Sequence, residues 1–228
     1  MRATWYEKQG AARDVLTVGE MDDPQPQDGE VRIRIAASGI NPGDVKKRQD
    51  AYGYGMPFPR IIPHSDGAGT IDAVGKGVSE EWIGRRVWRY GAQTYRPFGT
   101  AAEYTVVPLE QAVPLPEAVS FEQGACLGIP VITAHRAVHV AGSVQGKIVL
   151  VQGGAGAVGA TAVQLAYRAG ARLVFENFGA PLFFDWRLRE CNYGARNGQP
   201  AKIVRGERLK YLDVSYPNGK SWRQDVSV

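Results

Sequence analysis

The sequence predicts an α/β protein in which an irregular β-barrel precedes a single βαβ unit. Three observations lead to this prediction. Short strand-like runs separated by glycines and prolines fill residues 1–120, which is typical of barrels and sandwiches. A strand, a glycine-rich loop, a helix and a second strand follow over residues 147–175. From residue 176 onward the sequence shows no regular alternation of strands with helices.

The composition bounds the class of protein. The chain has 228 residues, of which 44% are hydrophobic, and this is enough for one large domain or two modest ones. No run of about 18 consecutive apolar residues occurs, and the N-terminus lacks the apolar core of a secretory signal, so we expect no membrane contact. Two cysteines, Cys126 and Cys191, exclude a disulfide framework and a four-cysteine zinc lobe. We therefore expect a cytoplasmic protein.

The net charge of +4 is concentrated near the C-terminus. Basic and acidic residues nearly balance over residues 1–175, and most of the excess lies in residues 176–228. A balanced body argues against a nucleic-acid-binding surface, and no recognition motif accompanies the weakly basic tail. We therefore do not expect nucleic acid to be a partner.

The first part of the chain has the pattern of strands and turns. Residues Val31–Ala36 alternate apolar and polar side chains, as in a strand with one buried face. Before them, Asp22–Gly29 is a proline-containing connector. The sequence Asn41–Asp44 predicts a tight turn in which glycine accepts a positive φ. Further strands are expected in the apolar runs Gly67–Val74, Arg86–Tyr90 and Glu103–Val107.

The pattern changes near residue 120. Ser120 and Gln123 fit a capping box, which predicts a short helix after Ser120. Pro130 fits the first turn of a second helix. The apolar run Lys147–Val151 predicts a strand covered on both faces. A helix over Val158–Ala169 follows, with Ala162, Leu165, Ala166 and Ala169 on its apolar side. Gly170 suits its left-handed end, and Arg172–Phe175 begins a second strand.

A glycine-rich loop lies between the first of these strands and the long helix. Its residues form a G-x-G-x-x-G motif: Gly154, Ala155, Gly156, Ala157, Val158 and Gly159. The strand–loop–helix context predicts a dinucleotide site, because the helix N-terminus offers free N–H groups to a pyrophosphate. The alternative is a tight turn without a ligand. Glu176 stands where an acid contacts a ribose and favours NAD, but the same position also suits a solvent-facing residue.

Three separated motifs carry a resemblance to a known family. They are Ser38–Asp44 (SGINPGD), Ile62–Gly69 (IPHSDGAG) and Gly153–Gln164. In this order they resemble the zeta-crystallin-like NADPH:quinone oxidoreductases, which are zinc-free members of the medium-chain dehydrogenase/reductase superfamily. The resemblance covers about three quarters of the chain. It implies a GroES-like domain over residues 1–120, a partial Rossmann domain over 121–175, and a tail outside the family pattern over 176–228.

The resemblance also implies an activity and a set of site residues. The activity is hydride transfer from NADPH, with NADH as an alternative, to a small quinone or enone. Asn41 and Tyr52 are the expected catalytic residues, and Asn41 and Thr133 are expected beside the nicotinamide. Each also has a structural interpretation: Asn41 starts a turn, Tyr52 is an exposed loop aromatic, and Thr133 caps a helix.

The expected enzyme contains no zinc. Where zinc-dependent relatives carry cysteine, histidine and cysteine ligands, this chain has Asn41, Ser65 and Ile129. These three side chains cannot supply the thiolates and imidazole that catalytic zinc requires. His135 and His139 lack the glutamate of an H-E-x-x-H motif, so we interpret them as surface or packing residues.

The tail departs from the family. The fourth strand that completes a dinucleotide crevice is expected after residue 175, and no such pattern follows. Phe183–Arg187 and Lys210–Val214 could be isolated strands. We expect apolar Ile148, Leu150, Leu173 and Phe175 to lack partners on one face of the half-sheet. The break suggests an altered reading frame, an alternative splice or a fused sequence.

This departure leaves two functional hypotheses. The first is a quinone reductase. The second is a truncated, non-catalytic product or a GroES-like binding module without a competent cofactor site. Relatives are expected to form homodimers through the Rossmann sheet edge, which the partial domain lacks.

Overall fold

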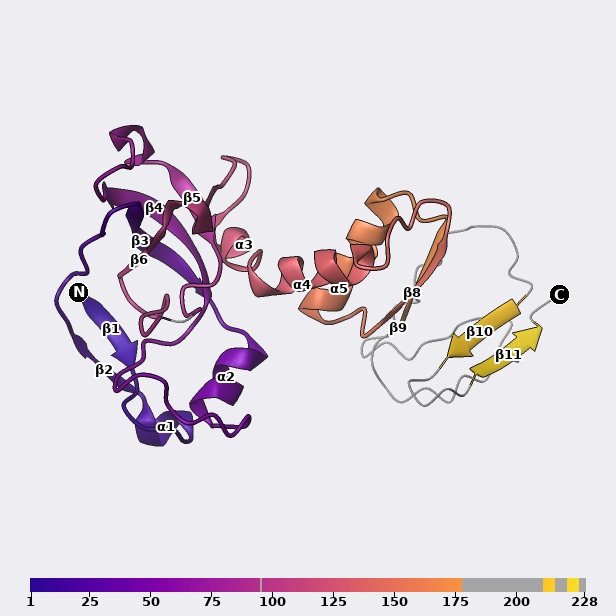
Figure 1. The fold of residues 1–228 in the computed structure, drawn as a ribbon, viewed down its shortest axis with the longest axis horizontal. Coiled ribbons are helices and arrows are strands. Elements are labelled where there is room, and N and C mark those ends of the chain that lie inside the picture. The colour runs from indigo at the N-terminus through magenta and orange to yellow at the C-terminus, as the bar shows by residue number, and fades with distance from the viewer. Residues whose placement is uncertain (95, 178–210, 216–220, 226–228) are drawn as a thin grey trace. The chain divides into compact units, whose positions relative to one another are not determined.

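A computed structural model describes residues 1–94, 96–177, 211–215 and 221–225. The chain forms two compact units, Met1–Thr133 and Ala134–Val228 (Figure 1). The boundary between the two units falls within the helix over Ile129–His139, whereas the domain boundary expected from the sequence lies at residue 120. Each unit has its own hydrophobic core.

A five-stranded antiparallel sheet organises the first unit. Its strands lie in the order β6-β3-β4-β5-β7. Their bounds are β3 (Glu30–Gly39), β4 (Asp66–Val74), β5 (Arg86–Arg89), β6 (Tyr104–Pro108) and β7 (Ala112–Pro114). The strands predicted from apolar runs are confirmed. Val31 and Ile33 are fully buried, as the alternation predicts, and they pack with Ile71, Val87 and Val107. Two 3₁₀ turns, η1 (Glu80–Trp82) and η2 (Leu109–Gln111), connect strands.

The same unit contains a second, separate sheet of two strands. Strand β1 (Arg2–Trp5) pairs with β2 (Thr17–Glu20), and the short helix α1 (Ala12–Val15) lies between them in the chain. Isolated bridges join Ala3 to Ala102, Tyr6 to Ile61, and Ile62 to Phe98. These bridges connect distant segments of the chain and produce the irregular barrel-like domain that the sequence predicts.

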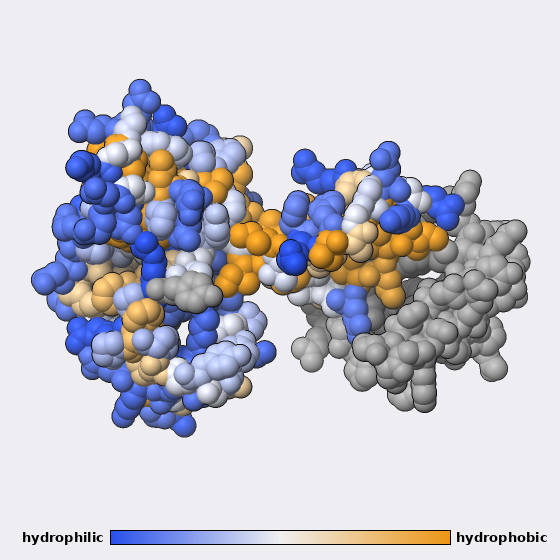
Figure 2. Space-filling view, in the orientation of Figure 1, coloured by the Kyte–Doolittle hydropathy of each residue, from blue (hydrophilic) through white to orange (hydrophobic). Residues whose placement is uncertain are grey.

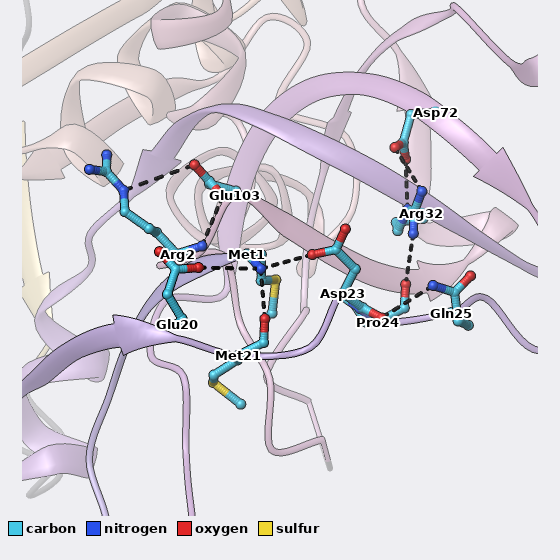
Figure 3. Close-up of polar contacts among 10 residues, drawn as sticks. All are labelled: Met1, Arg2, Glu20, Met21, Asp23, Pro24, Gln25, Arg32, Asp72 and Glu103. Atoms are coloured by element: carbon cyan, nitrogen blue, oxygen red, sulfur yellow. Dashed lines mark hydrogen bonds and ion pairs between the residues drawn. The ribbon is translucent and has the colours of Figure 1, made fainter.

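Polar contacts hold the N-terminal segments against the sheet (Figure 3). The Met1 ammonium donates to the carbonyl of Met21 at 2.6 Å and pairs with Asp23 at 2.9 Å. Arg32 donates to both carboxylate oxygens of Asp72, at 3.1 and 3.0 Å, and to the carbonyl of Pro24 at 3.3 Å. The prolyl connector is therefore tied to β3 through Arg32 and to the N-terminus through Asp23, because its carbonyl and carboxylate groups accept from charged donors.

The turn predicted over Asn41–Asp44 is the first turn of a helix. Helix α2 (Pro42–Arg48) begins at Pro42, and Gly43 does not have a positive φ. The prediction of a tight turn was therefore wrong. Proline is preorganised for the first helical position, and the Asp44 carboxylate accepts from the backbone N–H of Asn41 at 2.8 Å. Both features favour a helix over a reversal of the chain.

The predicted helices after residue 120 are confirmed. Helix α3 (Phe121–Ala125) has the expected capping box: Gln123 N donates to Ser120 Oγ at 3.2 Å, and Ser120 N donates to Gln123 Oε1 at 2.9 Å. Helix α4 (Ile129–His139) follows, with Pro130 in its first turn.

The βαβ unit is also confirmed. Strand β8 (Ile148–Gln152), helix α5 (Ala157–Arg168) and strand β9 (Leu173–Asn177) follow in order, and β8 pairs with β9 in parallel. Gly170 has a φ of +80°, as its predicted place at the helix end requires. The core of this unit comprises Ala134, Val138, Val151, Ala162 and Ala166.

The other face of β8 is exposed to solvent. Ile148 is 40% exposed and Leu150 is 53% exposed, and Figure 2 shows apolar surface near this strand. The expectation of unpartnered apolar residues is thus confirmed for β8. The side chains of Leu173 and Phe175 lie outside the described residues. Among the described helices, none is long and apolar enough to cross a membrane.

One segment of the tail forms a hairpin. Strand β10 (Tyr211–Ser215) pairs in antiparallel register with β11 (Ser221–Asp225), so that Tyr211 lies opposite Asp225. The strand expected over Lys210–Val214 is confirmed as β10, but the expectation that it is isolated was wrong, because β11, which was not predicted, pairs with it. The second expected strand, Phe183–Arg187, lies outside the described residues.

Candidate functional site

The first candidate site is built around the carboxylate of Asp66, the first residue of β4. Asn41 follows β3, is 6% exposed, and donates from Nδ2 to Asp66 Oδ2 at 2.8 Å. The backbone N–H of Ile129, at the start of α4, donates to the same oxygen at 2.8 Å. The structure therefore brings together Asn41 and Ile129, two of the three positions compared with zinc ligands. The third, Ser65, is buried beside Asp66 in the chain.

Burial and charge set the electrostatics of this site. Asp66 is 1% exposed, and burial raises the pKa of its carboxyl, although the hydrogen bonds from Ile129 and Asn41 lower it. Arg89 on β5 is fully buried, and burial lowers the pKa of its guanidinium to about 9, against the opposing effect of Asp66. Arg89 is thus still a cation at neutral pH. Within the described part of the chain, Asp66 Oδ1 and the Nε and Nη1 atoms of Arg89 have no hydrogen-bond partner.

Close backbone packing fixes the position of Asp66. A Cβ atom on Gly128 would lie 2.1 Å from Asp66 Oδ1, and one on Gly39 would lie 2.2 Å from the carbonyl oxygen of Ala125. Such distances are far inside van der Waals contact. Glycine is therefore required at both positions for the segment before α4 to approach β3 and β4.

His64 is a titratable residue that sequence reasoning missed. It has a φ of +76°, unusual for a residue other than glycine. Its Nδ1 lies 2.9 Å from Ser38 Oγ, which lies 2.8 Å from Thr100 Oγ1. Thr100 donates to the carbonyl of Asp66 at 2.6 Å, so Ser38 donates to Thr100 and His64 Nδ1 donates to Ser38. Burial lowers the pKa of His64.

Tyr52 lies at a pocket of the first unit. It is 48% exposed, and its ring stacks on Tyr54 with centroids 5.9 Å apart and planes 22° apart. The pocket has a volume of about 480 Å³. Its lining includes the aromatic residues Tyr6, Tyr52, Tyr54 and Phe58 together with Lys47, Asp50, Gln93 and Arg96. Asn41 is not among the lining residues, so this pocket does not unite the two expected catalytic residues.

Thr133 is exposed in the interior of α4. The interpretation of Thr133 as a helix cap is therefore wrong, because the residue lies away from both helix ends. It belongs to the first compact unit, whereas the glycine loop belongs to the second.

The glycine loop has the predicted place between β8 and α5. Gly153 has a φ of +80°, and Gly156 is the N-cap of α5. A Cβ atom on Gly159 would lie 2.1 Å from the carbonyl oxygen of Gly153, which leaves room only for glycine. At Gly156, by contrast, a Cβ atom would meet only that carbonyl oxygen, at 3.4 Å. The loop backbone is thus packed tightly around Gly159, whereas a side chain at Gly156 would meet little of the protein.

The open side of the loop, at Gly156, fits a phosphate group. The first intrahelical bond shown for α5 runs from Ala160 N to the carbonyl of Gly156, at 2.8 Å, so the N–H groups of residues 157–159 precede the helical ladder. Ala155, Gly156, Ala157 and Val158 are exposed. Free N–H groups and the positive end of a helix dipole favour an anion. Glu176 pairs with Val151 within the β8–β9 ladder, but its side chain is not described.

Known proteins match both parts of this arrangement. An alcohol dehydrogenase GroES-like domain model matches residues 27–117. The quinone oxidoreductase of Mus musculus is 40% identical over 206 residues, which cover 84% of this chain and 58% of that protein. The human quinone oxidoreductase is 38% identical over 154 residues, covering 66% of this chain and 45% of that protein.

Solved structures extend the likeness to the fold. A Novosphingobium aromaticivorans alcohol dehydrogenase superfamily protein is 34% identical with a TM-score of 0.68, and the match covers 77% of this chain and 52% of that one. Escherichia coli quinone oxidoreductase complexed with NADPH is 26% identical with a TM-score of 0.67, covering 79% and 53% respectively.

The chain spans about half the length of these relatives. Within that span, the matched GroES-like segment is followed in the same chain by the βαβ unit with its glycine loop. Residues 27–117 match the alcohol dehydrogenase GroES-like domain family, and over these two parts the chain is similar to quinone oxidoreductases.

Proposed function

We propose that this chain carries the acceptor-binding part and the first cofactor-binding unit of an NADPH-dependent quinone reductase. The observation that carries the proposal is the glycine loop, which is closed by Gly159 and open at Gly156, at the N-terminus of α5. Gly154 through Gly159 would hold the pyrophosphate through backbone N–H groups. When bound, the nicotinamide supplies the hydride, and the protein supplies position and electrostatics.

The acceptor pocket is the second part of the proposal. Its volume of about 480 Å³ lies in the range of small-molecule sites, which are mostly apolar with a few polar groups. Stacking on Tyr52 and Tyr54 would orient a planar quinone or enone, because offset aromatic rings attract each other. We place Asn41 and Thr133 beside the nicotinamide, as the family resemblance implies. The reduced acceptor would take its proton from water.

The proposed chemistry uses no zinc. Asn41 already donates to Asp66, and Ile129 contributes only its backbone N–H to this site. An amide and an aliphatic side chain are poor substitutes for the thiolates of catalytic zinc. No group of three or more metal-binding side chains occurs among the residues that the structure describes. A cytoplasmic location and a small-molecule partner complete the proposal.

Cofactor binding by the whole chain tests this function. We expect NADPH to quench intrinsic fluorescence and to raise the melting temperature of the wild type. Gly156→Val should abolish both effects without unfolding the protein, because its side chain fills the open side of the loop. Gly43→Val is a matched control, since a Cβ atom there meets nothing within 4 Å and its φ is not positive.

The alternative function predicts a different result. A non-catalytic product or GroES-like binding module would melt cooperatively but show no response to NADPH or NADH at millimolar concentration. That outcome would refute the reductase proposal for this chain. Binding of 1,2-naphthoquinone, measured separately by fluorescence, would then show whether the acceptor pocket works without a cofactor site.

A further inference from the structure

Helix α4 presents two histidines on one exposed face. The adjacent face of the helix, about 100° around its axis, carries Ala134 and Val138, which are buried in the core of the second unit. His135 is exposed and His139 is half-buried. Their rings lie with centroids 4.6 Å apart and planes tilted by 52°. Neither ring has a hydrogen bond or ion pair among the contacts found within the described residues, so no such contact competes with a ligand for the ring nitrogens.

The separation of the two rings matches that of two imidazoles on one metal ion. A metal lies about 2.0–2.1 Å from a ligating imidazole nitrogen, and hence roughly 3.2 Å from the ring centroid. Two rings bound at a right angle then have centroids about 4.5 Å apart, and two bound at a tetrahedral angle about 5.2 Å apart. The observed 4.6 Å is close to the right-angle value, which octahedral and square-planar ions require.

The i, i+4 spacing explains why the two rings lie close together. Residues four apart lie one above the other on a helix, and their side chains lean toward the helix N-terminus. Two imidazoles at this spacing on a helix are the metal ligands of H-E-x-x-H proteins. Here the intervening residues, Arg136, Ala137 and Val138, add no ligand, so water would complete the coordination shell.

We propose that His135 and His139 form a two-imidazole site for a divalent transition-metal ion of borderline softness, such as Ni²⁺ or Cu²⁺. The site is separate from the positions compared with zinc ligands in the first unit, and it does not depend on the proposed reductase activity. The bound ion joins two consecutive turns of α4. It therefore stabilises the last turn of this helix, and the stability of the protein rises with the concentration of the ion.

Titration with Ni²⁺ tests the proposal, using the full chain without a polyhistidine tag. Calorimetry should give one ion per chain at neutral to slightly alkaline pH, and the ion should raise the melting temperature. His135→Ala and His139→Ala should each weaken binding about tenfold or more, because even the loss of an outer partner of a metal ligand costs about that much. His64→Asn and Cys126→Ser should leave binding unchanged.

A variant with rearranged histidines is the matched control. The chain has three histidines, and the double change His139→Ala with Val140→His preserves that number. Val140 is 64% exposed, so the new side chain costs little stability, but its five-residue spacing points the two rings apart. This variant should bind as weakly as His139→Ala. Wild-type affinity in it, or absence of binding by the wild type, would overturn the proposal.

Discussion

The carboxylate of Asp66 has two tasks: it accepts hydrogen bonds from Asn41 and Ile129, and its charge interacts electrostatically with the buried cation of Arg89. Both hydrogen bonds end on Oδ2, so an asparagine could accept them through its amide oxygen. It could not balance the charge of Arg89, which is fully buried. Leaving a buried charge without its counterion costs about 3–5 kcal/mol.

Substitutions at Asp66 and Arg89 should therefore be coupled. We expect Asp66→Asn to lower the free energy of unfolding by roughly 3 kcal/mol, and Asp66→Asn combined with Arg89→Leu to cost less than the sum of the single changes. Urea unfolding of the four proteins of this cycle measures the coupling. Strict additivity would show that Arg89 does not depend on Asp66.

The burial of His64 predicts a dependence of stability on pH. Since burial lowers the pKa of His64 below 6.5, the unfolded chain takes up the proton more readily than the folded protein does. The neutral, buried His64 therefore contributes to the stability of the folded protein above pH 6.5. This stabilisation is lost as the pH falls through that value toward the folded-state pKa.

The variant His64→Asn isolates this effect, because asparagine tolerates a positive φ. Between about pH 7 and pH 5, the range in which histidine titrates, the wild type should lose stability more steeply than His64→Asn. Urea unfolding across that range measures both slopes. His135→Asn is the control for general loss of a histidine. Parallel curves for wild type and His64→Asn would contradict the assignment.

At the scale of elements, the loop between β8 and α5 makes a prediction about two neighbouring glycines. An alanine at Gly159 places its Cβ atom 2.1 Å from the carbonyl of Gly153, and overpacking of this kind costs about 1–3 kcal/mol. An alanine at Gly156 meets the same oxygen at 3.4 Å and should cost about 1 kcal/mol or less. Thermal unfolding compares them. Equal losses would mean that the loop is not closed as described.

Elements defined by local signals could be predicted from the sequence. The strands of the main sheet, the capping box at Ser120 and the βαβ unit all follow from periodicity and from residues close together in the chain. Helix α2 was mistaken for a turn because Asn-Pro-Gly-Asp fits both, and Pro42 at the first helical position and the bond from Asn41 N to the Asp44 carboxylate favour the helix. The alternation of apolar and polar residues in the sequence did not indicate that β10 pairs with β11.

The site was predicted in part for the same reason. The glycine loop is a contiguous motif, and Asn41 was found through a resemblance to known sequences. The contact of Asp66 with Ile129 joins residues 63 positions apart, and Arg89 reaches the site from a third strand. Such contacts depend on strand order, which periodicity does not specify. The sequence did offer one signal of this contact: Arg89 is a charged residue within the predicted strand Arg86–Tyr90.

At the scale of the whole molecule, each compact unit buries its own core, but the small parallel sheet is covered unequally. Within the described residues, β8 pairs only with β9. Val151 is 9% exposed and packs against α4 and α5, whereas Leu150, the preceding residue, is 53% exposed. An exposed apolar face beside an open strand edge favours association between molecules.

Neighbouring substitutions on the two faces of β8 should therefore differ in their effects: one should change association between molecules and the other should change stability. Leu150→Thr removes exposed apolar surface, so it should leave the melting temperature nearly unchanged and reduce concentration-dependent light scattering. Val151→Thr buries a hydroxyl group and should lower stability by about 1–3 kcal/mol without reducing association. A fall in melting temperature for Leu150→Thr as large as that for Val151→Thr would contradict this, since it would mean that the Leu150 side chain is packed within the protein in solution.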